Sequence, residues 1–221
     1  MDDDAIWRVI DDERSRLADL LDELGDAEWR TPSLCTAWTV RDVVAHLTLA
    51  HASPLTAAVG LIRAGGNFDR TIRDTAIRQA RLPVPELRRR LRAMVGSRRI
   101  VPFLVPINPM IDVLCHAQDI ARPLGRTHPM PVAPAVAAAD RIWGQSFPFR
   151  SQRRLAGFEL VATDAPWRAG SGVRVEGPMS ALLLLVTGRP AALAELSGPG
   201  AATLPARFPH VTGTAPTKER S

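Results

Sequence analysis

The chain has 221 residues, of which 46% are hydrophobic, and a formal net charge of +5, a composition that allows a globular protein with its own core. It contains no uncharged run of 18 apolar residues, which argues against a transmembrane helix, and the acidic start MDDD is unlike the basic start of a signal peptide. Two cysteines, Cys35 and Cys115, are too few for the disulfide framework of a small secreted protein, so we predict a cytoplasmic protein.

Charge is distributed unevenly along the chain. Residues 1–26 carry ten acidic residues against three arginines, whereas residues 63–99 carry eleven arginines against three acids. Such a basic region can attract nucleic acid, an acidic partner or an anionic substrate, or it can pair with the acidic first segment. Lys218 is the only lysine of the whole chain, so the many arginines reflect a general preference of this sequence for arginine over lysine. No nucleic-acid-binding motif accompanies them, and nucleic-acid binding is not favoured.

The first half of the chain reads as helices. Apolar residues at helical spacing predict a helix over residues 4–24 that ends at Gly25. A second helix is expected to begin at Thr39, because Thr39 and Asp42 have the spacing of a capping box, and to continue over residues 55–62.

Two further helical regions follow. Residues 70–97 are helical in pattern on both sides of a proline pair at 83 and 85, which must interrupt the helix. The next helix is expected to start with Asn108 as its N-cap and Pro109 as its first residue, and to stop near residues 123–125. Helix following helix, with no strand pattern before residue 150, predicts a mainly α protein with an up-and-down four-helix bundle.

The pattern changes after a short helix expected at residues 133–144. Residues 158–163 alternate between apolar and polar, a second short strand is expected at residues 173–175, and an apolar helix at residues 179–186. We therefore predict a helical bundle over residues 1–148, a small α+β domain over residues 149–208, and a disordered tail over residues 209–221.

Three side chains are candidate metal ligands. Asp112 and His116 are four residues apart, so they share one helix face with Cβ atoms about 5–6 Å apart. His46 stands in the middle of an apolar helix, where a polar side chain needs a partner. A carboxylate with two imidazoles suits zinc or another first-row divalent ion. By spacing alone, a hydrogen-bonded core histidine and a chance acid–histidine pair remain open alternatives.

The polar and sulfur-containing neighbours of these residues are open to simpler interpretations. Cys115 points about 100° around the helix from His116, which favours packing. Cys35 is expected to be a small buried residue in the loop before the second helix. Asp119 could orient His116 as an outer-shell acceptor, or form an ion pair with Arg122.

Three segments carry a family resemblance. They are residues 26–47 (DAEWRTPSLCTAWTVRDVVAHL), 112–125 (DVLCHAQDIARPLG) and 177–189 (GPMSALLLLVTGR). In this order the chain resembles the mycothiol-dependent maleylpyruvate isomerase-like proteins, which belong to the DinB/YfiT-like superfamily of metal-binding four-helix bundles with a small C-terminal domain. The resemblance implies a DinB-like fold and a metal held by His46, Asp112 and His116.

The resemblance also implies an activity. It suggests a metal-dependent and mycothiol-dependent isomerase or transferase that acts on a small electrophilic substrate, with zinc as the first choice and nickel or another first-row ion as alternatives. It further suggests a catalytic role for Arg189, whose competing interpretation is a side chain that only interacts with the end of its own helix.

Two departures from the family pattern bear on these expectations. Asp112 stands where the family has glutamate, which is longer by about 1.5 Å, and Pro123 should end its helix early. The alternative hypothesis is therefore a non-catalytic small-molecule-binding or regulatory protein that keeps the DinB-like fold with a vestigial metal site.

Overall fold

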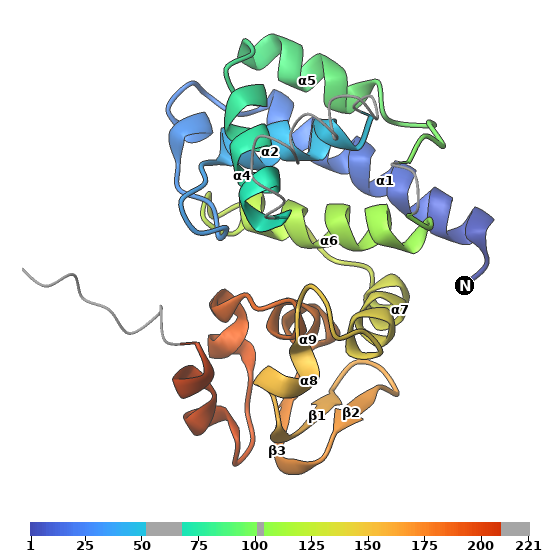
Figure 1. Cartoon of the computed structure of the whole chain (residues 1–221), viewed down its shortest axis with the longest axis vertical. Helices are drawn as coiled ribbons and strands as arrows, with labels where there is room; N and C mark the ends of the chain where they lie inside the picture. Colours follow the sequence, from blue (N-terminus) through green and yellow to red (C-terminus); the bar gives the residue numbers. More distant parts are fainter. Residues whose placement is uncertain (52–67, 101–103, 209–221) are drawn as a thin grey trace, which may run out of the picture. The chain divides into compact units, whose positions relative to one another are not determined.

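The computed structural model describes residues 1–51, 68–100 and 104–208, and the chain divides into two compact units, Met1–Pro129 and Met130–Ser221 (Figure 1). The expected boundary was residue 148; the helix at residues 132–143 belongs to the second unit, where it packs against a later helix. The helix expected at residues 55–62, the start of the basic region and the tail expected over residues 209–221 lie outside the described residues.

The first unit consists of helices. They are α1 (Asp3–Asp22), α2 (Val40–Thr48), α4 (Phe68–Gln79), α5 (Val84–Arg92) and α6 (Ile107–Ala121), with the short 3-10 helices η1 (Glu28–Arg30) and η2 (Leu49–His51). Helix α2 packs against α4, α5 and α6, and α1 packs against α5 and α6. The predicted mainly α fold with a helical bundle and a small α+β part is confirmed.

The core of this unit follows from the apolar stripes of its helices. Leu17 and Leu21 of α1 and Val43 and Val44 of α2 have no solvent exposure, and Leu87 of α5 lies in the same buried cluster. Burial of each such side chain stabilises the fold by about 1.5–3 kcal/mol. This packing holds α2, and the histidine it carries, in a fixed place between its neighbours.

The start of α2 is the predicted capping box. The Thr39 hydroxyl accepts from the Asp42 backbone N–H at 3.3 Å, and the Asp42 carboxylate accepts from the Thr39 N–H at 2.8 Å. These bonds satisfy donors that a helix start otherwise leaves without partners. The polar residues before the apolar run therefore fix where α2 begins.

The start of α6 differs from the prediction. The helix begins at Ile107 with Pro106 at the N-cap, and Asn108 lies inside the first turn, where its side chain accepts from the Val105 N–H at 3.2 Å. Pro109 is the third helical residue. The first turn of a helix has no acceptors for its N–H groups, so proline is tolerated at any of these positions and does not mark the first one.

The second unit combines a three-stranded sheet with helices. Its elements are α7 (Val132–Trp143), α8 (Ser151–Arg154), β1 (Gly157–Ala162), β2 (Arg168–Gly170), β3 (Gly172–Gly177), α9 (Met179–Val186), η3 (Pro190–Glu195) and η4 (Ala201–Arg207). The strand order is β2-β1-β3, with β2 antiparallel and β3 parallel to β1. Strands β1 and β3 and helix α9 lie where the sequence predicts them, whereas β2 was not predicted.

The step from β2 to β3 depends on glycine. The chain passes from one side of β1 to the other within Gly170, Ser171 and Gly172, and both glycines have positive φ angles, +77° and +130°. A Cβ atom at Gly172 would lie 2.0 Å from the Gly157 carbonyl oxygen. No other residue fits so close a backbone approach.

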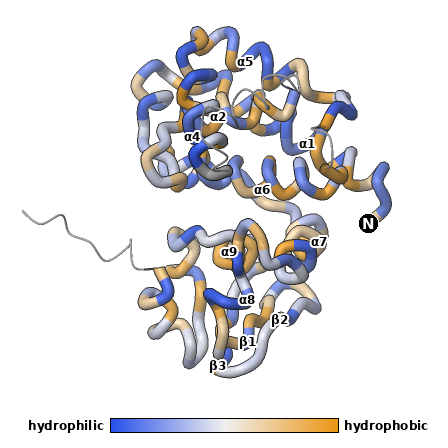
Figure 2. The backbone as a smooth tube through the Cα atoms, in the orientation of Figure 1, coloured by the Kyte–Doolittle hydropathy of each residue, from blue (hydrophilic) through white to orange (hydrophobic). Residues whose placement is uncertain are grey.

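Helix α9 is apolar around almost its full circumference and is correspondingly buried, and it packs against α7, β1 and η3 (Figure 2). A helix that is hydrophobic on all sides belongs in a core or in a lipid bilayer. Its eight residues are too few to span a bilayer. None of the helices in the described part of the chain has the length and apolarity needed to cross a membrane.

Candidate metal centre

Helices α2 and α6 bring three candidate ligands together. Asp112 Oδ1 lies 3.5 Å from His46 Nε2 and 3.3 Å from His116 Nε2. The three ligand atoms lie within 4.8 Å of one another. His46 and Asp112 are half-buried and His116 is buried, so the cluster is mostly screened from solvent while the carboxylate keeps an exposed edge.

These distances fit a small divalent ion. Zinc bonds to nitrogen and oxygen are about 2.0–2.1 Å long, which places the ligand atoms of a tetrahedral site about 3.3–3.4 Å apart. The two separations measured from Asp112 Oδ1 have this size. The aspartate thus reaches both imidazoles, although its side chain is shorter than the glutamate that the resemblance implies at this position.

The opposite side of the His116 ring is held by a second carboxylate. Asp119 has no solvent exposure, and its Oδ2 accepts from His116 Nδ1 at 2.7 Å. An acceptor on Nδ1 leaves the lone pair of Nε2 facing His46 and Asp112. The sequence allowed this orienting role for Asp119 as one of two interpretations, and the structure supports it.

Cys35 has a more specific place than the sequence indicated. Its thiol donates to Asp119 Oδ2 at 3.1 Å, and its sulfur lies 3.7 Å from His116 Nδ1. The backbone N–H of Leu34 also donates to the Asp119 carbonyl at 3.2 Å. The loop before α2 is therefore attached to α6 at Asp119. No local signal could have revealed this contact, because Cys35 and Asp119 are 84 residues apart in the sequence.

Trp38 forms an apolar wall beside the two imidazoles. Its ring centroid lies 5.3 Å from that of His46 and 6.4 Å from that of His116, and the residue is only 8% exposed. The two histidine rings are themselves 4.9 Å apart in an edge-on arrangement. An aromatic wall keeps water from one side of the ligands, which strengthens electrostatic interactions there.

The charges of the cluster shift its pKa values in opposite directions. Burial alone would raise the pKa of Asp112, but His46 and His116 outweigh it and hold this pKa well below its ordinary value of 3.8. Burial likewise would lower the pKa of His116, but Asp112, Asp119 and Cys35 raise it well above 6.5. Asp112 and His116 thus each favour the charged form of the other.

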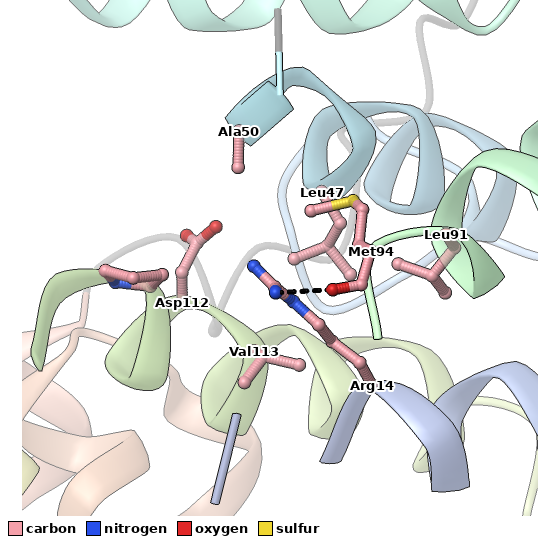
Figure 3. Close-up of a pocket in the computed structure, with 8 residues that line it drawn as sticks. Arg14, Leu47, Ala50, Leu91, Met94, Asp112 and Val113 are labelled. Atoms are coloured by element: carbon pink, nitrogen blue, oxygen red, sulfur yellow. Dashed lines mark hydrogen bonds between the residues drawn. The ribbon is translucent and has the colours of Figure 1, made fainter. Parts of the chain in front are cut away.

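A small cavity adjoins Asp112. It is lined by Asp112 and Arg14 together with the mostly apolar side chains Leu47, Ala50, Leu91, Met94, Pro109 and Val113. Figure 3 shows the Arg14 guanidinium and the Asp112 carboxylate directed into this space. Arg14 was not among the predicted site residues, because one more arginine on an acidic helix carries no signal.

The sequence also singled out Arg189 and Cys115. Arg189 belongs to the second unit, where it is the N-cap residue of η3, and its backbone N–H donates to the Leu184 carbonyl at 2.8 Å. Cys115 is buried on α6 beside His116. The described residues hold two groups of candidate ligands, one of His46, Asp112 and His116 and one of Cys35, His116 and Asp119, and Cys115 belongs to neither.

The arginines of α5 are engaged in ion pairs within the protein. Arg88 and Arg92 bind acidic side chains of α1, and Arg89 and Arg90 bind Glu86 of their own helix. Much of this basic region is therefore neutralised internally, which leaves less positive charge for a nucleic-acid partner.

Comparisons with known proteins bear on the fold and on part of the first unit. Residues 10–100 match the family model described as the mycothiol maleylpyruvate isomerase N-terminal domain, a span that includes His46 and ends before α6. A crystal structure of the mycothiol-dependent maleylpyruvate isomerase is similar with a TM-score of 0.60 and 16% sequence identity, over 86% of this chain and 90% of that chain.

A histidine-to-alanine mutant of that enzyme is similar with a TM-score of 0.61 and 16% identity, over 91% of this chain and 94% of that chain. At this identity the two structures show a shared fold. No curated protein matches the chain.

Proposed function

We propose that this chain, whose residues 10–100 match the mycothiol maleylpyruvate isomerase N-terminal domain family, is a divalent-metal-dependent and mycothiol-dependent isomerase or transferase of a small electrophilic substrate. The observation that carries the proposal is the convergence of His46 Nε2, Asp112 Oδ1 and His116 Nε2 at separations suited to one ion. Three protein ligands are typical of catalytic sites, whereas structural sites use four.

The side chains of the cluster have separate tasks in this proposal. His46, Asp112 and His116 would hold the ion, and Asp119 keeps His116 in the orientation that presents Nε2. A zinc ion bound there would supply Lewis-acid chemistry, which stabilises a thiolate at neutral pH. Trp38 shields the two imidazoles from water, so this stabilisation would act in a medium of low polarity.

Arg189 completes the proposal as a catalytic residue for anionic substrates, on the strength of the family resemblance. Its replacement by glutamine should lower turnover of maleylpyruvate with mycothiol, the substrate pair named for the similar structures, and leave metal content unchanged. Turnover equal to that of the wild type would remove Arg189 from the proposal.

Metal analysis tests the core of the proposal. Protein purified without a histidine tag should contain about one divalent ion per chain, zinc being the first choice. His46→Ala and His116→Ala should each lose the ion, while the control His210→Ala, in the C-terminal segment, should keep it. Unchanged metal content in both cluster variants would contradict the assignment.

Thiol binding separates the proposal from its rival. Calorimetric titration of mycothiol should give heat with the metal-loaded protein and none with the metal-free protein, if the ion takes part in binding. Metal-independent binding, or no binding to either form, would favour the non-catalytic small-molecule-binding or regulatory protein.

A further inference from the structure

A second group of possible metal ligands lies on the far side of the His116 ring. Cys35 Sγ, His116 Nδ1 and Asp119 Oδ2 lie within 4.8 Å of one another. The sulfur is 3.1 Å from the carboxylate oxygen and 3.7 Å from the ring nitrogen, and the nitrogen and the oxygen are 2.7 Å apart. This group shares only the His116 ring with the first cluster, whose contact with Asp112 uses the opposite nitrogen, Nε2.

The three donor atoms form a triangle of a size that suits a metal ion. Bonds from zinc to nitrogen or oxygen are about 2.0–2.1 Å long, and a bond to sulfur is about 2.3 Å long. An ion slightly outside the plane of the triangle reaches all three atoms at about these lengths after small side-chain movements. His116 and Asp119 are fixed on α6, three residues apart, whereas Cys35 belongs to the loop before α2, which can adjust.

Sulfur gives this group a preference that the first cluster lacks. A thiolate is a soft ligand, whereas the first cluster offers only imidazole nitrogen and carboxylate oxygen. Asp119 and His116 are buried and Cys35 is half-buried, so the thiol is the member that an ion meets first. A thiolate and a carboxylate together carry two negative charges, and a divalent ion neutralises both in this buried place. The group therefore favours soft divalent ions.

We propose that Cys35, His116 and Asp119 form a second metal site, for soft divalent ions such as Cd²⁺, and that an ion there excludes an ion from the first cluster. A neutral imidazole has one nitrogen lone pair, so it can bind a metal on one side only. When Nδ1 binds the soft ion, the ring proton moves to Nε2, and the thiol proton is released to solvent. The second site stands independently of the proposed function, whereas the exclusion rests on it and makes the soft ion an inhibitor.

Cadmium titration of the metal-free full chain, in a reductant that is not itself a thiol, tests the site. Cadmium bound to a thiolate gives an ultraviolet charge-transfer band, which imidazole and carboxylate ligands do not give. Because Cys35 and Cys115 are the only cysteines of the chain, two variants assign the band. The wild type and Cys115→Ser should show it, with saturation at about one equivalent, and Cys35→Ser should not.

The result that overturns the site is equally specific. Absence of the band from the wild type, or its persistence in Cys35→Ser, would contradict the assignment of Cys35 as a ligand. If Cys35→Ser does not fold, Cys35→Ala also removes the sulfur and takes its place. His46→Ala removes a ligand of the first cluster alone, so it should keep the cadmium band.

Zinc release tests the exclusion. In zinc-loaded wild type, cadmium should release zinc, measured with a zinc-binding dye, at a concentration at least tenfold lower than in zinc-loaded Cys35→Ser. Only direct replacement of zinc in the first cluster remains possible in that variant. Equal cadmium dependence in the two proteins would overturn the exclusion.

Failure of the proposed function would look different. A wild type that binds no zinc but gives the cadmium band through Cys35 would contradict the proposed metal dependence and support the second site. A wild type that binds zinc through His46 and His116 but gives no cadmium band would support the proposed metal dependence and overturn the second site.

Discussion

Two carboxylates on α6 contact the same histidine from opposite sides, and their surroundings differ sharply. The Asp112 side chain is 37% exposed and its oxygen lies between two imidazoles at 3.3–3.5 Å, whereas the Asp119 side chain has no exposure and contacts His116 at 2.7 Å. The position of Asp112 suits a ligand that binds one ion together with the two imidazoles. The position of Asp119 suits a group that orients the His116 ring. One helix can thus carry both tasks, because residues four before and three after the shared histidine lie on neighbouring parts of its face.

Replacing the ligand carboxylate should have the largest effect. Asp112→Ala leaves two histidines, and we expect metal affinity to fall more than about 100-fold, beyond the loss typical of outer-shell changes. The free energy of unfolding of the metal-free protein should change by less than about 1 kcal/mol, because the side chain is partly exposed. Competition with a zinc-binding dye and chemical denaturation measure the two quantities. Retained affinity would contradict the ligand role.

Replacing the orienting carboxylate should cost less metal affinity but more stability than replacing Asp112. Asp119→Asn removes the charged acceptor of His116 Nδ1, so we expect metal affinity to fall about 10–100-fold and the metal-free protein to lose about 1–3 kcal/mol of stability. Asp140→Asn, which weakens the Asp140 bond to Trp167 Nε1 in the second unit, is a matched control and should leave metal affinity unchanged. A stability loss without an affinity loss would make Asp119 purely structural.

The opposed pKa shifts predict a pH dependence of metal binding. The ion needs a neutral His116, whose pKa is raised well above 6.5, so protons compete with the metal below that raised pKa. Apparent affinity should fall by up to about tenfold per pH unit as the pH is lowered through this range. Metal titrations at several pH values measure it, and a flat profile would show that His116 is neutral without the metal.

The same shifts set the pH window in which the pair stabilises the metal-free protein. His116, with its raised pKa, contributes fully below 6.5 and loses its contribution as the pH rises through the raised pKa. Asp112, with its lowered pKa, contributes above 3.8 and loses its contribution as the pH falls through the lowered pKa. The stability difference between the metal-free wild type and Asp112→Asn should therefore be largest between pH 3.8 and 6.5.

The smallest expected effect concerns the thiol that contacts Asp119. Cys35→Ala removes one donor to a buried carboxylate, worth about 0.5–1 kcal/mol, so metal affinity should fall about two- to fivefold. Cys35→Ser keeps a donor at the same position and should stay within twofold of the wild type. Equal losses in both variants would point to packing of the sulfur rather than to the hydrogen bond.

The predictable parts of the fold are those decided by neighbours in the chain. The capping box of Thr39 and Asp42, the apolar stripe of α2 and the fully apolar α9 depend on contacts within a few residues, and their positions agree with the prediction. The start of α6 and the short strand β2 were not predicted. Proline is tolerated throughout the first helical turn, and β2 exists because glycine lets the chain cross β1 so closely.

The candidate site likewise has one part that the sequence predicts and another that it does not. The sequence alone placed Asp112 and His116 on one helix face, because four residues complete about one helical turn. Only the tertiary structure decided that His46 lies 3.5 Å from Asp112, that Cys35 reaches Asp119, and that Arg14 faces the same cavity. These contacts join residues that are far apart in the sequence, and their geometry follows from how α1, α2 and α6 pack their apolar faces, which no local pattern records.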